Sequence, residues 1–160
     1  MQVQRQSNGR RLTLDPTATL GAGGEARIYT VAQDRSMVAK IYHTPTPAHA
    51  RKLAAMLANP PDDPMLAQGH ISIAWPLDVL YTTDGRQCVV GFLMPYVSRM
   101  RPLVAYYNPL TRRQQCPLFN YRYLLRTAHN FAAAMRALHD HGHVIGDVNE
   151  SISWLPTPPW

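Results

Sequence analysis

The sequence predicts an α+β fold, in which a five-stranded antiparallel sheet carries one helix and a helical segment follows. Short runs of strand-forming residues, separated by turn residues, occupy the first part of the chain. Further along, apolar residues recur at helical spacing over about 20 residues. The length of 160 residues suits one domain or part of a larger one, and a hydrophobic content of 46% can form a core.

Turn residues divide the first part of the chain into strands. Residues 1–11 are polar, and we expect them to form a flexible N-terminus. Glycine-rich residues 21–24, the 34–36 turn and the Thr83-Asp84-Gly85 turn separate most of the strand-forming runs. The strands are expected at residues 12–20, 26–31, 37–42, 70–75 and 87–94.

Capping residues mark the expected helices. Thr46 is a suitable N-cap and Pro47 suits the first helical position, so a helix is expected to run from there to about residue 58. A second, longer helix is expected between Asn120, as its N-cap, and Gly142, which ends it. A short helix is expected at residues 103–107, in the connection before it.

Charge and hydropathy restrict the partners. The net charge is +6 and fourteen of the sixteen cationic residues are arginine, which favours contact with phosphates or acidic surfaces. No apolar run approaches the ~20 residues that cross a bilayer, and the N-terminus has no apolar signal core, so we expect a cytoplasmic protein without membrane contact. A nucleic-acid surface is the alternative to a solvated basic face, and it is less favoured because no recognition pattern accompanies the arginines. Those arginines are Arg99, Arg101, Arg112, Arg113, Arg122, Arg126 and Arg136.

Three motifs carry candidate chemistry. The glycines of residues 21–24 let backbone N–H groups approach a phosphate, although a hairpin turn without a ligand also explains them. Lys40 lies 19 residues later on an expected strand, where its ammonium can reach phosphates under that turn. The alternative is a strand lysine that extends to solvent, which the scarcity of lysine disfavours. Asp147 follows the long helix and can accept a proton, although turn formation also explains it.

In this order the motifs resemble the protein kinase superfamily, and its divergent bacterial members most of all. The resemblance implies a kinase-like N-lobe at residues 12–97 and the first helices of an incomplete C-lobe, with a catalytic-loop remnant, at residues 98–150. It implies ATP as cofactor, with Mg²⁺ in the complete family domain. It also implies site residues: phosphate cover by Gly21, Ala22, Gly23 and Gly24, adenine contact by Ile28, phosphate pairing by Lys40, an adenine hinge at Met94 and Tyr96, and Asp147 as catalytic base.

The sequence departs from the family pattern at the charged positions. The family pairs its strand lysine with a helix glutamate, but no acid lies between Thr44 and Asn59, and Asp62 and Asp63 are the nearest substitutes. The family's metal-binding asparagine corresponds to Ile152, and no Asp follows Asp147, so we expect no metal site. Residues 151–160 (SISWLPTPPW) are interpreted as an aberrant Pro/Trp tail that arose by frameshift or truncation.

The resemblance implies a parent activity of phosphoryl transfer from ATP to protein Ser/Thr, whose protein substrate stays open. We expect this chain alone to bind nucleotide weakly and to turn over negligibly. The alternatives are a non-catalytic, pseudokinase-like interaction module and a basic nucleic-acid-associated protein. Because the later helices of a kinase would cover the apolar stripe of the long helix, we also expect self-association through that face.

Overall fold

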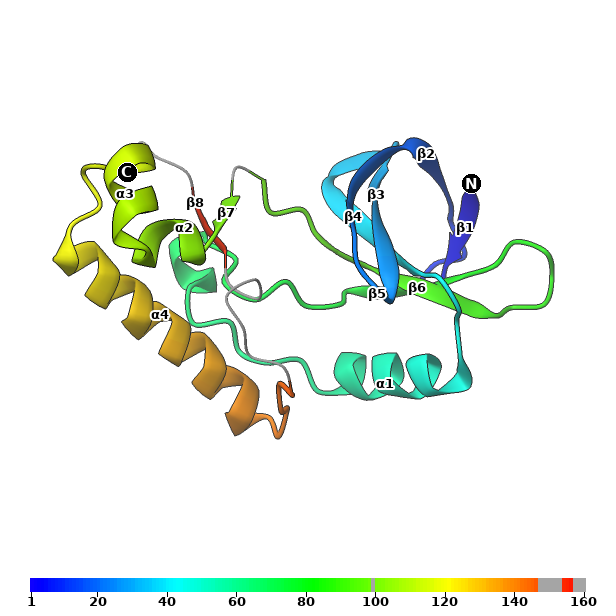
Figure 1. Ribbon diagram of the computed structural model, residues 1–160. Coiled ribbons are helices and arrows are strands. Elements are labelled where there is room, and N and C mark those ends of the chain that lie inside the picture. The colour runs from blue at the N-terminus through cyan, green and yellow to red at the C-terminus, as the bar shows by residue number, and fades with distance from the viewer. Residues whose placement is uncertain (99, 147–153, 157–160) are drawn as a thin grey trace. The chain divides into compact units, whose positions relative to one another are not determined.

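The computed structural model describes residues 1–98, 100–146 and 154–156 (Figure 1). The chain divides into two compact units, and each is described by itself. The barrel unit comprises Met1–Pro60 and Ala74–Tyr96. The helical unit comprises Pro61–Ile73 and Val97–Trp160.

Six antiparallel strands form the barrel unit. They are β1 (Gln2–Arg5), β2 (Arg11–Ala22), β3 (Ala26–Val31), β4 (Asp34–Tyr42), β5 (Asp78–Tyr81) and β6 (Val89–Pro95). Their order is β1-β2-β3-β4-β6-β5, and β1 pairs with both β2 and β5, which closes the sheet into a barrel (Figure 1). The sequence led us to expect five strands and a flexible N-terminus. The structure instead has β1 within residues 1–11, because the buried Val3 anchors it.

The interior of the barrel is apolar. Every strand contributes at least one side chain to a buried cluster, as a closed barrel requires of its inward-facing positions. Full burial of one such aliphatic side chain contributes about 1.5–3 kcal/mol, so this cluster supplies much of the unit's stability. Its members are Val3, Leu12, Leu14, Val31, Ala39, Ile41, Leu80 and Leu93.

The prediction of a strand at residues 70–75 is wrong. This stretch has no regular secondary structure, and the fifth strand along the chain lies later, at β5. The Asp63 carboxylate accepts hydrogen bonds from the backbone N–H groups of Ser72 and Ile73, so these donors are not available to a strand ladder. Pro76 follows and cannot donate at all. A carboxylate nine to ten residues earlier in the chain therefore overrides a local alternating pattern.

Helix α1 (Pro47–Ala58) confirms the first predicted helix. Thr46 is its N-cap: its hydroxyl accepts from the His49 backbone N–H, while His49 Nδ1 accepts from the Thr46 N–H. Leu53 is the buried residue of α1, and it belongs to a second cluster on the outer face of the barrel together with Ala26, Tyr42, Val79 and Phe92. The helix is thus fixed to the sheet by one side of its surface.

The helical unit contains α2 (Val104–Tyr107), α3 (Pro109–Gln115), α4 (Tyr121–Asp140) and the short 3-10 helix η1 (Leu66–Gln68). Asn120 caps α4 as predicted, because its side chain accepts from the N–H groups of Arg122 and Tyr123. A small core forms from Tyr106, Cys116 and Phe119. No helix in the part of the chain that the structure describes combines the length and apolar character needed to cross a membrane.

One strand pair completes the helical unit. Strand β7 (Met100–Pro102) pairs antiparallel with β8 (Trp154–Pro156). The second of these strands falls within residues 151–160, which we interpreted from the sequence as an aberrant tail. Part of that segment therefore has a backbone partner in the fold.

Candidate nucleotide-binding site

A single row of cross-strand neighbours links the glycine turn to Lys40. Gly21 on β2 pairs with Ile28 on β3, Ile28 pairs with Lys40 on β4, and Lys40 pairs with Phe92 on β6. Residues directly opposite one another in antiparallel strands project to the same face. Ile28, Lys40 and Phe92 therefore lie side by side on the outer face of the barrel, next to the turn that bears the glycines.

The ammonium of Lys40 rests near an aromatic ring. Its Nζ atom lies 5.8 Å from the centroid of the Phe92 ring, within the range of a cation–π contact. No ion pair of Lys40 occurs among residues 1–98, 100–146 and 154–156. The sequence of α1 contains no carboxylate that could pair with it. Lys40 is thus a half-buried cation held on a strand, with no carboxylate from α1 to compensate its charge.

Gly91 allows the strand of Lys40 to lie where it does. A Cβ atom at Gly91 would come within 2.0 Å of the Lys40 carbonyl oxygen and 3.0 Å of Ile41 Cα, both backbone atoms. Such distances are far below contact, so β4 and β6 can approach only because this position has no side chain. Gly91 was not among the predicted site residues, although an isolated glycine inside a strand is a known signal of close backbone approach.

The three glycines of the turn have no comparable internal role. A Cβ atom at Gly21 or Gly24 would meet nothing within 4 Å, and one at Gly23 would meet only the Ala26 carbonyl oxygen, at 4.0 Å. None of the three has a φ in the left-handed region that favours glycine. Neither packing nor backbone conformation therefore requires glycine here, and the turn presents bare backbone at its surface.

Hydrogen bonds fix the turn at both ends. The Gly23 N–H donates to the Ala26 carbonyl oxygen at 2.9 Å, which closes the turn. His43, just after β4, contacts it twice: its backbone N–H donates to the Glu25 carbonyl at 2.9 Å, and its Nε2 lies 2.9 Å from the Gly23 carbonyl oxygen. His43 could not be selected from sequence patterns, because this contact depends on the register of β3 and β4.

The expected hinge residues lie at the end of β6. Met94 pairs with Val38, two positions before Lys40 on β4, so Met94 and Val38 share the face of Lys40. Met94 packs against the outer cluster, while Tyr96 is exposed and its backbone N–H donates to the Ser36 carbonyl oxygen at 2.8 Å. Every predicted nucleotide contact, from Gly21 to Tyr96, thus belongs to the barrel unit.

An aromatic stack borders the same outer face. The ring centroids of Tyr42 and His49 lie 4.0 Å apart, and the angle between the two ring planes is 5°. This contact connects the end of β4 to the start of α1. Burial raises the pKa of Tyr42, and the negative charge of Glu25 raises it further. Tyr42 therefore stays neutral at physiological pH and acts as a packing surface.

The two acids proposed as substitutes for a helix glutamate have partners within the helical unit. Asp63 accepts from the Ser72 hydroxyl and from the backbone N–H groups of Met65, Ser72 and Ile73. Burial pushes the pKa of Asp63 upward, but these hydrogen bonds outweigh it, and the net pKa is lowered. Asp62 Oδ2 lies 3.3 Å from His141 Nε2. The hydrogen bonds of the Asp63 carboxylate thus stabilise its own loop.

Asp147, the predicted catalytic base, lies outside the described residues, as does Ile152. Among the residues that the structure describes, no group of three or more His, Cys, Asp or Glu side chains is placed to hold a metal ion. The predicted site residues that the structure describes therefore all belong to the barrel unit or to the loop of Asp62 and Asp63.

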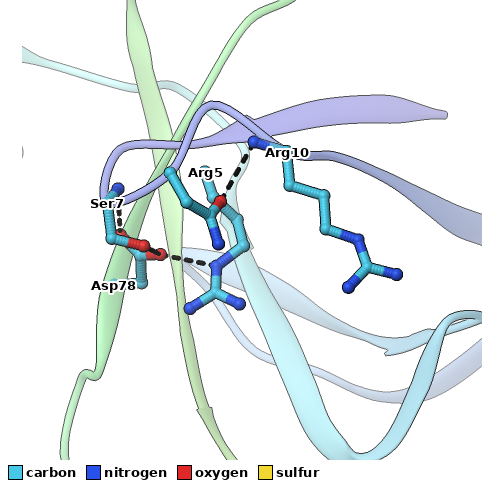
Figure 2. Close-up of polar contacts among 5 residues, drawn as sticks. Arg5, Ser7, Arg10 and Asp78 are labelled. Carbon is cyan, nitrogen blue, oxygen red and sulfur yellow. Dashed lines mark hydrogen bonds and ion pairs between the residues drawn. The ribbon is translucent and has the colours of Figure 1, made fainter.

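An ion pair with a buried carboxylate anchors the N-terminal strand, and it was not predicted from the sequence. Arg5 Nε donates to Asp78 Oδ2 at 2.6 Å, and the carboxylate also accepts from the Ser7 hydroxyl at 2.6 Å and from the Ser7 backbone N–H at 3.1 Å (Figure 2). Asp78 is only 3% exposed. These contacts join the end of β1 and the β1–β2 turn to the start of β5, the strand with which β1 closes the barrel.

Comparison with known proteins supports a kinase-like assignment for the chain. Two curated proteins are similar to it, and both carry the name protein kinase YegI. The one from Escherichia coli O157:H7 is 40% identical over 136 residues, which are 85% of this chain and 20% of that protein. The one from Escherichia coli K12 is 40% identical over 132 residues, 82% of this chain and 20% of that protein. The chain thus spans about a fifth of the length of these relatives. No family model matches it.

Proposed function

We propose that the barrel unit is the nucleotide-binding part of a protein-kinase-like protein and that its ligand is ATP. The observation that carries the proposal is the row from Gly21 through Ile28 to Lys40, which sets a strand ammonium beside a turn of bare backbone. Similarity to proteins named as protein kinases supports the same conclusion independently.

Each group in the row suits one part of ATP. The Gly23 N–H is bonded to the Ala26 carbonyl oxygen, so the Gly24 N–H is the donor that we assign to a phosphate oxygen, and the lack of side chains at Gly21, Gly23 and Gly24 lets a phosphate approach the turn. The Lys40 ammonium offsets phosphate charge, and Phe92 stabilises it when no ligand is bound. Ile28 offers an apolar contact for adenine. The backbone between Met94 and Tyr96 would meet the edge of the base through carbonyl oxygens, because Pro95 has no N–H and the Tyr96 N–H donates to Ser36.

For the kinase-like protein as a whole we propose phosphoryl transfer from ATP to protein Ser/Thr, with Asp147 as the proton acceptor. Mg²⁺, which accompanies ATP, would neutralise charge on the phosphates. A second candidate is a nucleotide-binding module without turnover. It is favoured by the composition of α1, because no carboxylate of that helix is available to orient Lys40.

Thermal denaturation with and without ATP tests nucleotide binding. A ligand at 100 times its dissociation constant stabilises the folded state by about 2.7 kcal/mol, which raises the melting temperature by several degrees in a chain of this size. We expect the Lys40→Ala variant to lose this shift. Lys52→Ala is the matched control, because Lys52 is the only other lysine and is exposed on α1. An equal shift in wild type and Lys40→Ala would refute the assigned role of Lys40.

Transfer of the γ-phosphate separates the two candidates. The purified chain is incubated with γ-labelled ATP, Mg²⁺ and a general protein acceptor, and labelled protein is measured against an Asp147→Asn variant. Binding without labelled protein favours the non-catalytic module. Labelling that Asp147→Asn abolishes favours phosphoryl transfer.

A further inference from the structure

The imidazole of His43 holds one peptide unit of the glycine turn. Its Nε2 lies 2.9 Å from the Gly23 carbonyl oxygen. Because a carbonyl oxygen only accepts, Nε2 must carry the proton in this contact. The backbone N–H of the same residue donates to the Glu25 carbonyl oxygen at 2.9 Å, so His43 bonds to two carbonyl groups of the turn, those on either side of Gly24.

The hydrogen bond from His43 to the Gly23 carbonyl oxygen determines the direction of the Gly24 N–H. In a trans peptide unit the C=O of one residue and the N–H of the next are antiparallel and lie in one plane. With the Gly23 carbonyl directed at His43, the Gly24 N–H is directed away from it. The Gly23 N–H is already bonded to the Ala26 carbonyl oxygen at 2.9 Å, which limits rotation of the turn on its other side.

The position of this amide suits an anionic ligand. Gly24 is exposed, and no atom lies within 4 Å of the place where its Cβ would be, so a ligand oxygen can approach its backbone closely. A turn of this composition without a tether would sample many orientations, because glycine has the greatest backbone freedom. Fixing the amide before binding removes part of that entropic cost.

We infer that His43 is a positioning residue that presets the glycine turn, so that the Gly24 amide donates to a phosphate of the nucleotide. This inference rests on the proposed function, since it deepens the account of the same site. His43 acts through Gly23 and has no contact with the ligand. Its effect is therefore confined to ligands that carry phosphates and leaves binding of the nucleoside unchanged.

Calorimetric titration of the full chain with ATP and with adenosine tests the inference. The contact is exposed and worth about one ordinary hydrogen bond, so His43→Ala is expected to weaken ATP binding about three- to tenfold. Adenosine affinity is expected to stay within about twofold. His43→Gln keeps a side-chain N–H donor and is expected to recover most of the loss. His70→Ala is the control, because His70 is also exposed and lies in the other unit.

A spectroscopic readout separates positioning from direct contact. The backbone ¹⁵N–¹H signal of Gly24 should shift in ligand-free His43→Ala relative to wild type, and ATP should shift it less in the variant. An unmoved ligand-free signal would overturn the inference even if ATP affinity falls. Equal ATP affinity of wild type and His43→Ala would overturn it and leave the proposed function intact. Failure of wild type to bind ATP would overturn both.

Discussion

Replacement of Gly91 by alanine tests whether close approach of β4 and β6 sets the site. The added Cβ would lie 2.0 Å from the Lys40 carbonyl oxygen and 3.0 Å from Ile41 Cα, and neither atom can move without its strand. Overpacking of this kind costs about 1–3 kcal/mol. If the strands separate instead, hydrogen bonds of a ladder that runs from Met37 to Ile41 are lost, each worth about 1 kcal/mol.

We therefore expect Gly91→Ala to lower the free energy of unfolding by about 3 kcal/mol or more, a large share of the 5–15 kcal/mol of a typical domain. Urea denaturation followed by circular dichroism measures it. Gly24→Ala is the matched control, because its Cβ would meet nothing within 4 Å and its φ is not left-handed. That variant should stay within about 1 kcal/mol of wild type. Equal stability of Gly91→Ala and Gly24→Ala would refute the reasoning.

Three further predictions concern other contacts. Asp78→Ala leaves the partly exposed Arg5 guanidinium without its carboxylate and should cost about 2 kcal/mol in urea denaturation, whereas Asp84→Ala, at an exposed pair, should cost well under 1 kcal/mol. Because the pKa of Asp63 is lowered in the folded chain, its ionised carboxylate stabilises the loop fully above the ordinary Asp pKa of 3.8, and this stabilisation is lost as pH falls through the lower folded value. The Ser72 amide resonance should therefore move only in that acid range, and it should not move in Asp63→Asn. Leu125 lies in the apolar stripe of α4 and is 52% exposed, so Leu125→Ser should reduce any self-association seen in sedimentation velocity, and a wild-type monomer at all concentrations would contradict self-association through this face.

The helices could be predicted because their signals are local. Thr46 with Pro47, and Asn120 before an apolar stripe, fix the starts of α1 and α4 within a few residues of chain. Strand β1 carries only one deeply buried side chain, Val3, between polar neighbours, and its partners lie elsewhere in the sequence. No periodicity in so short a segment reveals a strand that tertiary pairing creates.

The parts of the candidate site that depend on local contacts could likewise be predicted, and those that depend on long-range pairing could not. The glycine turn and Lys40 belong to a local meander of β2, β3 and β4, so their proximity could be predicted from order alone. Phe92 and Gly91 come from β6, more than one element later, and their relation to Lys40 depends on the exact register of a long-range pair. The contact of His43 with Gly23 also depends on register, and sequence patterns do not specify it.

Closure of the barrel by β1 also bears on how the chain meets other chains. Both β2 and β5 have one neighbour supplied by Gln2–Arg5, so loss of those four residues would leave two rows of unsatisfied backbone donors and acceptors. Open rows of this kind recruit strands from neighbouring molecules. Strand β1 thus protects two strand edges from pairing with other molecules, and deletion of Gln2–Arg5 should promote polymerisation through these edges.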